Sequence, residues 1–162
     1  MANRSTGLAC DVAVDAELWG NEQALTALSE RALNAAAAHV ADLLPDDPEV
    51  SVVFTDDNSI QALNAQWRGM DKPTNVLSFA ANDASGPPSP LLGDIVLAQE
   101  TIAREAKAQE KAFDDHVTHL LVHGFLHLLG HDHLDDEEAD TMEETERQVL
   151  AGLGIADPYG ET

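Results

Sequence analysis

Three histidines stand at the spacing of metal ligands between residues 123 and 133, where the chain reads HGFLHLLGHDH. His123 and His127 are four residues apart, so on an α-helix they share one face and lie one turn from each other. Gly130 is expected to end this helix, because glycine accepts the left-handed backbone angles that let a chain turn back. His133 can then reach the same metal ion from the far side. The stretch therefore favours a buried helix that ends in a glycine turn and carries a three-histidine metal site.

A site of this kind implies a reaction class. Three protein ligands leave one position of a tetrahedral Zn²⁺ ion open for water, and such a water loses a proton near neutral pH and becomes a nucleophile. A histidine on an apolar helix is more often a core residue, but burying three unpaired imidazoles among the leucines of this helix would be costly. We therefore expect His123, His127 and His133 to be metal ligands and catalytic residues of a hydrolase.

Other polar residues near this stretch have two interpretations each. His131 could be a fourth ligand or a solvent-facing side chain, and we prefer the second. His116 and His119 precede His123 on the same helix face. His119 is either a group behind a ligand or beside the substrate, or a polar residue at the edge of the buried face. Asp132 could orient an imidazole by accepting its second N–H, or it could be a solvated turn residue.

The residue after the first histidine argues against a peptidase. In the zinc-protease motif His-Glu-x-x-His, that position holds the glutamate that acts as general base. Here the position is Gly124. A glycine at this point also leaves space beside the metal, for a bulky substrate or for a close backbone approach. A peptidase of the zinc-protease type would therefore lack its general base.

Length and cysteine content indicate one domain in a reducing compartment. The chain of 162 residues suits a single domain over 1–162, with the polar residues 1–7 expected to be flexible. The single cysteine, Cys10, excludes a disulfide framework and is most simply a small buried residue of an early strand. We find neither an apolar signal core nor a stretch near the ~20 apolar residues of a membrane span. A cytoplasmic protein without membrane contact is expected.

The charge is unfavourable for nonspecific nucleic-acid binding. A net charge of -22 opposes contact with phosphates, which depends on Lys and Arg. The distribution is uneven, because residues 132–162 hold eleven of the thirty acidic residues. A basic cleft on an acidic body therefore remains open, and the other acidic residues are most simply solubilising surface. Five of the eight basic residues fall between 68 and 111: Arg68, Lys72, Arg104, Lys107 and Lys111.

Hydrophobic periodicity and turn residues predict an α+β fold with a mixed, about four-stranded sheet packed by about five helices. Aspartate at 56 or 57 is expected to cap the second helix. The Pro-Asp-Asp-Pro run at 45–48 predicts a turn, and 81–90 predicts an irregular loop that could cover the site. Strands are expected at 8–14, 50–54, 76–79 and 95–98, and helices at 21–44, 56–67, 99–109, 113–129 and 135–152.

Three blocks of the sequence carry a resemblance to a known family. HGFLHLLGHDH is similar to the signature H-G-x-L-H-L-x-G-x-D-H. LNAQWRGMDKPTNVLSF at 63–79 resembles L-N-x-x-(Y/W)-R-x-x-D-x-x-T-D-V-L-S-F, except that Asn75 stands where aspartate is usual. LGDIVLA at 92–98 resembles a third block. In order and spacing, these blocks resemble the YbeY family, bacterial metal-dependent endoribonucleases of rRNA maturation, over most of the chain from about residue 50.

The resemblance implies a zinc-dependent, single-strand-specific endoribonuclease with one Zn²⁺ per chain. Its implied roles are 16S rRNA 3′-end maturation, ribosome biogenesis and ribosome quality control. The implied partners are single-stranded regions of rRNA and the ribosome, or its small subunit with associated proteins. The oligomeric state stays open.

The resemblance also equates Arg68 with the catalytic-site arginine of the family. A guanidinium forks onto two phosphate oxygens, so Arg68 can hold the scissile phosphate against the metal and offset charge in the transition state. Two other hypotheses stay open at this point. One is a metallohydrolase of peptide or amide bonds. The other is a non-catalytic, ribosome-associated protein whose metal is structural, with a fourth ligand such as His131.

Overall fold

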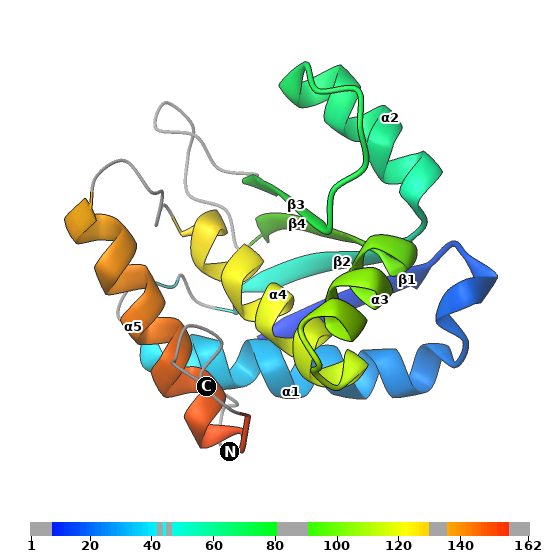
Figure 1. Ribbon diagram of the computed structural model, residues 1–162. Helices are drawn as coiled ribbons and strands as arrows, with labels where there is room; N and C mark the ends of the chain where they lie inside the picture. The colour runs from blue at the N-terminus through cyan, green and yellow to red at the C-terminus, as the bar shows by residue number, and fades with distance from the viewer. Residues whose placement is uncertain (1–7, 42–43, 45–46, 81–90, 130–135, 156–162) are drawn as a thin grey trace.

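A four-stranded mixed sheet forms the centre of the protein (Figure 1). The computed structural model describes residues 8–41, 44, 47–80, 91–129 and 136–155. The strands lie in the order β1-β2-β4-β3, with β1, β2 and β4 parallel and β3 antiparallel to β4. The α+β expectation is therefore confirmed. The strands are β1 (Ala9–Val14), β2 (Glu49–Thr55), β3 (Val76–Ala80) and β4 (Leu91–Ala98).

Helices cover the two faces of the sheet unequally. On one face α1 and α4 pack together and share the main core with the inward-facing residues of β2, while α5 lies beside them (Figure 1). On the other face α2 contributes to a small second core above β3 and β4. The helices are η1 (Glu17–Trp19, a 3-10 turn), α1 (Glu22–His39), α2 (Asp57–Arg68), α3 (Gln99–Ala108), α4 (Phe113–Leu128) and α5 (Asp136–Gly152).

Helix caps follow the expected chemistry at two N-termini. The side chain of Asn21 accepts hydrogen bonds from the first turn of α1, and the side chain of Asp56 accepts one from Ser59 N at 2.8 Å in α2. The prediction for the end of α1 was wrong, because the helix stops at His39 and not at residue 44. At Val40 the backbone takes φ -128°, and its N–H bonds Ala37 O in a tightened last turn.

Strand β4 is longer than predicted. It begins at Leu91 instead of residue 95, although Gly93 lies inside it and glycine weakens strands. Pairing from both sides explains the difference, since Val50 of β2 and Ala80 of β3 both face Gly93 in the ladder. Residues 45 and 46 of the expected turn at 45–48 lie outside the described residues, as do the expected loop at 81–90 and the expected glycine turn at residue 130.

Helix α4 packs on the sheet through Gly124. A Cβ added there would lie 2.9 Å from Ser78 Oγ and 3.1 Å from Ile95 Cγ2. The missing side chain therefore serves a close approach of the helix to β3 and β4, which was one of its two interpretations. Ten residues of α4 are buried, as its apolar sequence predicts.

A larger side chain at residue 124 is expected to destabilise the fold. Gly124→Val should lower the free energy of unfolding by roughly 1–3 kcal/mol, because the added atoms have no space between α4 and the sheet. Urea denaturation followed by circular dichroism measures this change. Gly152→Val is the matched control, since a Cβ at Gly152 meets no atom within 4 Å. Equal midpoint shifts for the two variants would mean that the helix can move off the sheet without cost.

Cys10 lies in β1 and is half-buried. Burial, with a smaller contribution from the negative charge of Glu30, raises the pKa of its thiol to about 11. The thiol therefore stays protonated and unreactive near neutral pH.

Within the described ranges, we find no helix with both the length and the apolar character that a membrane crossing requires.

Candidate metal centre

His123 and His127 turn their Nε2 atoms toward each other from one face of α4, at a separation of 3.1 Å. Both rings are partly exposed, and their centroids lie 4.6 Å apart. Two imidazoles on one tetrahedral Zn²⁺, with Zn–N bonds of about 2.0–2.1 Å, hold their nitrogens about 3.3–3.4 Å apart. The observed separation is close to this value, so the pair fits two ligands of one ion.

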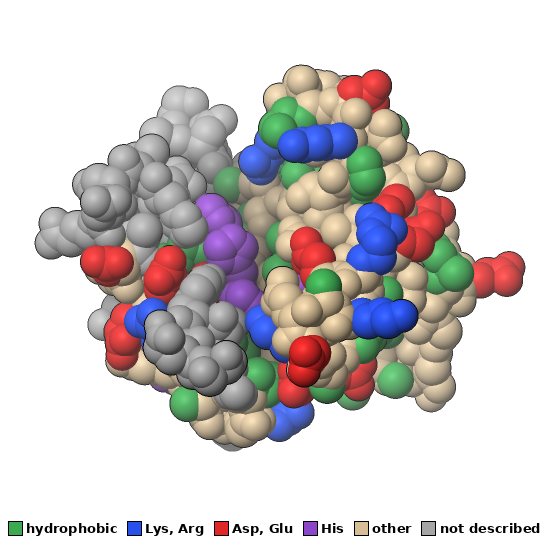
Figure 2. Space-filling model, in the orientation of Figure 1, with side chains coloured by type: hydrophobic (Ala, Val, Ile, Leu, Met, Phe, Trp, Pro, Cys, Tyr) green, Lys and Arg blue, Asp and Glu red, His purple; other side chains and the backbone are tan. Residues whose placement is uncertain are grey.

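The four histidines of α4 form a row on the same side of the helix, as the sequence predicts. Ring centroids of successive members lie 6.2, 6.2 and 4.6 Å apart. Figure 2 shows histidine side chains together in a hollow of the surface, with Lys and Arg side chains near the end of α2 above them. The members of the row are His116, His119, His123 and His127.

The side chain of Glu146 on α5 lies against His123 and His119. It is 0% exposed, and its Oε2 lies 2.7 Å from His123 Nδ1 while its Oε1 lies 3.0 Å from His119 Nε2. A carboxylate in this position keeps the proton of His123 on Nδ1 and leaves the Nε2 lone pair for a metal. His119 shares this carboxylate with His123, which agrees with the interpretation of His119 as a group behind an expected ligand.

The sequence prediction did not include Glu146, although the sequence holds a signal for it. Met142, Val149 and Leu150 are buried in α5 at helical spacing around residue 146. Glu146 thus lies in the middle of the apolar face of an acidic helix, and a carboxylate there requires a partner. Asp132, which could orient an imidazole or be a solvated turn residue, lies outside the described residues, as do His131 and His133.

Within the described ranges, no three His, Cys, Asp or Glu side chains come together as a metal site. Two of the three expected ligands, His123 and His127, are in place. The third, His133, lies outside these ranges, so the triad as a whole stays a prediction.

Removal of the charge of Glu146 is expected to weaken metal binding. Glu146→Gln keeps the shape of the side chain but not its charge, so zinc affinity should fall by about 10- to 100-fold. Titration of zinc against a competing chelator measures this change. Glu144→Gln, on the exposed side of the same helix, should bind zinc like the wild type. An unchanged affinity in Glu146→Gln would show that the carboxylate only fills space.

A second carboxylate contacts the far end of the histidine row. Oε1 of Glu105 accepts a hydrogen bond of 2.9 Å from Asn75 Nδ2 and lies 2.8 Å from His116 Nε2. Burial lowers the pKa of His116, and the hydrogen bond to Glu105 opposes this shift. An aspartate at residue 75 would face Glu105 with a like charge, so asparagine suits this position. The contacts join the residue before β3 to α3 and α4.

Arg68 contacts β3, the edge strand of the sheet that also contacts α4. It is the last residue of α2, which Gly69 ends in the left-handed conformation at φ 70°. The guanidinium donates a hydrogen bond of 3.0 Å to Ser78 O, and Ser78 Oγ donates one of 3.2 Å to Gly124 O, next to His123. Ser78 thus connects the arginine to the histidine row, and its bond uses one of the five N–H donors of Arg68.

Of the other basic residues near this region, Arg104 has a partner. Its Nη2 lies 3.0 Å from Asp57 Oδ2 at the start of α2. Asp57 therefore offsets the positive charge of Arg104 within the protein. The basic cleft that the charge distribution leaves open stays untested.

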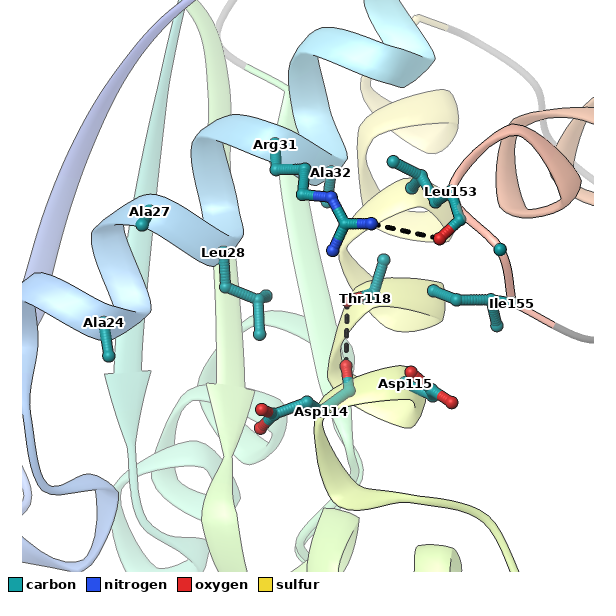
Figure 3. Close-up of a pocket in the computed structure, with 11 residues that line it drawn as sticks. Ala24, Ala27, Leu28, Arg31, Ala32, Asp114, Asp115, Thr118, Leu153 and Ile155 are labelled. Atoms are coloured by element: carbon teal, nitrogen blue, oxygen red, sulfur yellow. Dashed lines mark hydrogen bonds between the residues drawn. The ribbon is translucent and has the colours of Figure 1, made fainter.

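A hollow of about 490 Å³ lies between α1, the start of α4 and the end of α5 (Figure 3). Arg31 Nη2 donates to Leu153 O at 3.1 Å across it, and Thr118 Oγ1 donates to Asp114 O at 2.8 Å. Asp114 and His127 are thirteen residues apart on α4, or about 20 Å. The hollow is therefore separate from the metal centre.

Comparisons with known proteins agree on one family. The family model described as "Endoribonuclease YbeY" matches residues 14–154. The proteins named "Endoribonuclease YbeY" from Rhizobium etli and Sinorhizobium fredii are similar to this chain. The first is 56% identical over 150 residues (87% of this chain, 86% of that protein), and the second is 50% identical over 163 residues (96% and 94%). The solution structure of TM1509 from Thermotoga maritima has a similar fold, with a TM-score of 0.56 at 20% identity over 94% of this chain and 99% of that one.

Proposed function

The chain belongs to the YbeY family of endoribonucleases, and on that basis we propose that it cuts single-stranded RNA with one zinc ion held by His123, His127 and His133. The observation that carries the proposal is the pair of Nε2 atoms 3.1 Å apart, backed by the buried carboxylate of Glu146. Bound zinc supplies Lewis-acid chemistry, because it polarises a phosphoryl oxygen and makes water acidic near neutral pH.

The side chains of this chain prepare the site in two ways. Glu146 keeps the Nδ1 proton on His123, so the imidazole stays in the form that can bind a metal. Arg68 presents a forked cation next to β3, where it can take two oxygens of the scissile phosphate and offset the charge that gathers in the transition state. The reaction is hydrolysis or transfer at a phosphodiester bond of RNA.

The proposal extends to the substrate and its setting. We infer that the RNA is rRNA and that the reaction serves 16S rRNA 3′-end maturation, ribosome biogenesis and ribosome quality control. The ribosome or its small subunit, with associated proteins, is then the partner. A protein that matures rRNA works where ribosomes are assembled, so the proposal includes a cytoplasmic location. The relatives named as endoribonucleases support RNA as the substrate of this set of roles.

Peptide hydrolysis receives no support from the site. The residue that would carry the general base of a zinc protease is Gly124, and the space of its side chain is taken by Ser78 and Ile95. A structural metal would require a fourth protein ligand, and the candidate for it, His131, lies outside the described residues, so this alternative stays untested.

A cleavage assay tests the proposal. Zinc-loaded protein should cut a single-stranded rRNA fragment and leave both its duplex form and a denatured protein substrate intact. Removal of zinc by a chelator should stop the cleavage, and added zinc should restore it. Intact RNA in the presence of fully loaded protein would contradict the proposal, and digestion of the protein substrate would favour a peptidase.

A further inference from the structure

Trp67 is the most exposed large hydrophobic side chain among the described residues, at 64%. Ile60 and Leu63 precede it by seven and four residues on α2 and belong to the second core, so Trp67 extends the same helix face past the edge of that core. Its ring is held in an edge-to-face contact with Phe79, with centroids 6.2 Å apart and planes at 62°. The indole is therefore oriented but largely open to solvent.

The same phenylalanine also supports Arg68. The guanidinium carbon lies 5.9 Å from the centre of the Phe79 ring, and Nη2 is fixed to Ser78 O. The exposed indole of Trp67 and the guanidinium of Arg68 thus both contact Phe79, near the end of β3. Sites for single-stranded nucleic acids combine these two elements, a cation for the backbone and an aromatic ring on which a base stacks.

A groove of about 860 Å³ begins at this aromatic pair and crosses the exposed face of the sheet. Leu63, Trp67 and Phe79 line one part of it, and the carboxylates of Asp11 and Asp94 line another. Carboxylates repel a phosphate, but they accept hydrogen bonds from the amino and imino N–H groups of a base. The charge pattern therefore favours the RNA backbone at Arg68 and a base of the same strand in the groove.

From this arrangement we propose that Trp67, supported by Phe79, is a stacking site for one nucleobase of the RNA strand, next to the phosphate held by Arg68. The proposal rests on the proposed function and adds a base subsite to it. It also accounts for a preference for single strands, because a base in a duplex is already stacked and paired and cannot lie on the indole.

Tryptophan fluorescence tests the contact directly. The other tryptophan, Trp19, is 8% exposed and donates its Nε1–H to Thr55 O at 2.7 Å, so bound RNA can reach only Trp67. Zinc-loaded protein titrated with a 2′-O-methyl oligoadenylate, chosen so that the strand stays intact, should lose fluorescence. An abasic oligomer of the same charge should bind more weakly and leave the emission unchanged. Unquenched emission at saturating oligoadenylate would overturn the proposal.

Variants at residue 67 test the energetic contribution of the stack. Trp67→Ala should raise the Kd for the oligoadenylate about tenfold, and Trp67→Phe should bind like the wild type, because it keeps an aromatic face. Leu18→Ala is the control, since Leu18 is exposed to a similar degree, at 56%, and lies outside the groove. A wild-type Kd in Trp67→Ala would overturn the proposal.

Cleavage of an rRNA fragment separates this proposal from the proposed function. Trp67→Ala should raise KM with little change in kcat. If the wild type cuts RNA and Trp67→Ala has the same KM, the stacking site is wrong and the endoribonuclease stands. If the wild type cuts no RNA but the oligoadenylate still quenches Trp67, the base subsite stands and the proposed reaction is wrong.

Discussion

Replacement of His127 by alanine is expected to remove bound zinc and RNA cleavage together. The substitution deletes one of the two Nε2 atoms that lie 3.1 Å apart, and the remaining ligands form a poor site. Loss of an outer-shell partner costs about 10- to 100-fold in affinity or activity, so loss of a ligand should exceed about a hundredfold. Zinc content per chain and the rate of cleavage, measured on one preparation, report both effects.

His39→Ala is the matched control for this experiment. His39 is exposed near the end of α1, and its Nδ1 lies 3.2 Å from Ala35 O. This variant should keep zinc and activity. Because His127 is partly exposed, the His127→Ala protein should keep the helical circular dichroism signal of the wild type. One zinc ion per chain retained in His127→Ala would contradict the assignment of this ligand.

Arg68→Lys is expected to slow cleavage about a hundredfold, while zinc content and stability stay near wild-type values. Loss of one preorganised charge-stabilising donor costs roughly 3 kcal/mol in comparable sites. Lysine keeps the positive charge but cannot fork onto two phosphate oxygens. The single-turnover rate on a single-stranded rRNA fragment, with the urea unfolding midpoint as a second measurement, checks the expectation.

Arg104→Lys serves as the control for the arginine. Its guanidinium is already engaged with Asp57, so the exchange should leave the cleavage rate unchanged. If Arg68→Lys cuts at the wild-type rate and binds RNA equally well, Arg68 is only a surface residue. The phosphate contact would then be sought at Lys72 or Lys107.

The histidine face of α4 follows from local rules. The period of the helix alone places His123 and His127 on one side, one turn apart, whatever the rest of the fold does. The same holds for the caps at Asn21 and Asp56, where a side chain bonds the backbone two or three residues later. Most strands and helices were therefore predicted at nearly their observed positions.

Element boundaries and contacts between distant segments do not follow from such local rules. The early start of β4 depends on partners in β2 and β3, which no local pattern near residue 91 reveals. From the sequence, Gly124 could leave space for a substrate or allow a close backbone approach. The positions of Ser78 and Ile95 favour the close approach. Such outcomes are set by which elements pack together.

The sequence by itself determined the α+β class and the face of α4 that carries the histidines, because short-range helix and strand periodicity governs both. Three sequence blocks carried the family resemblance. Only the tertiary structure decided what stands behind and beside that face. Glu146 contacts His123 from 23 residues further along the chain, and Ser78, which contacts Arg68, bonds Gly124 across 46 residues. Contacts over such separations arise from the packing of α5 and β3 against α4, and no spacing in the chain encodes them.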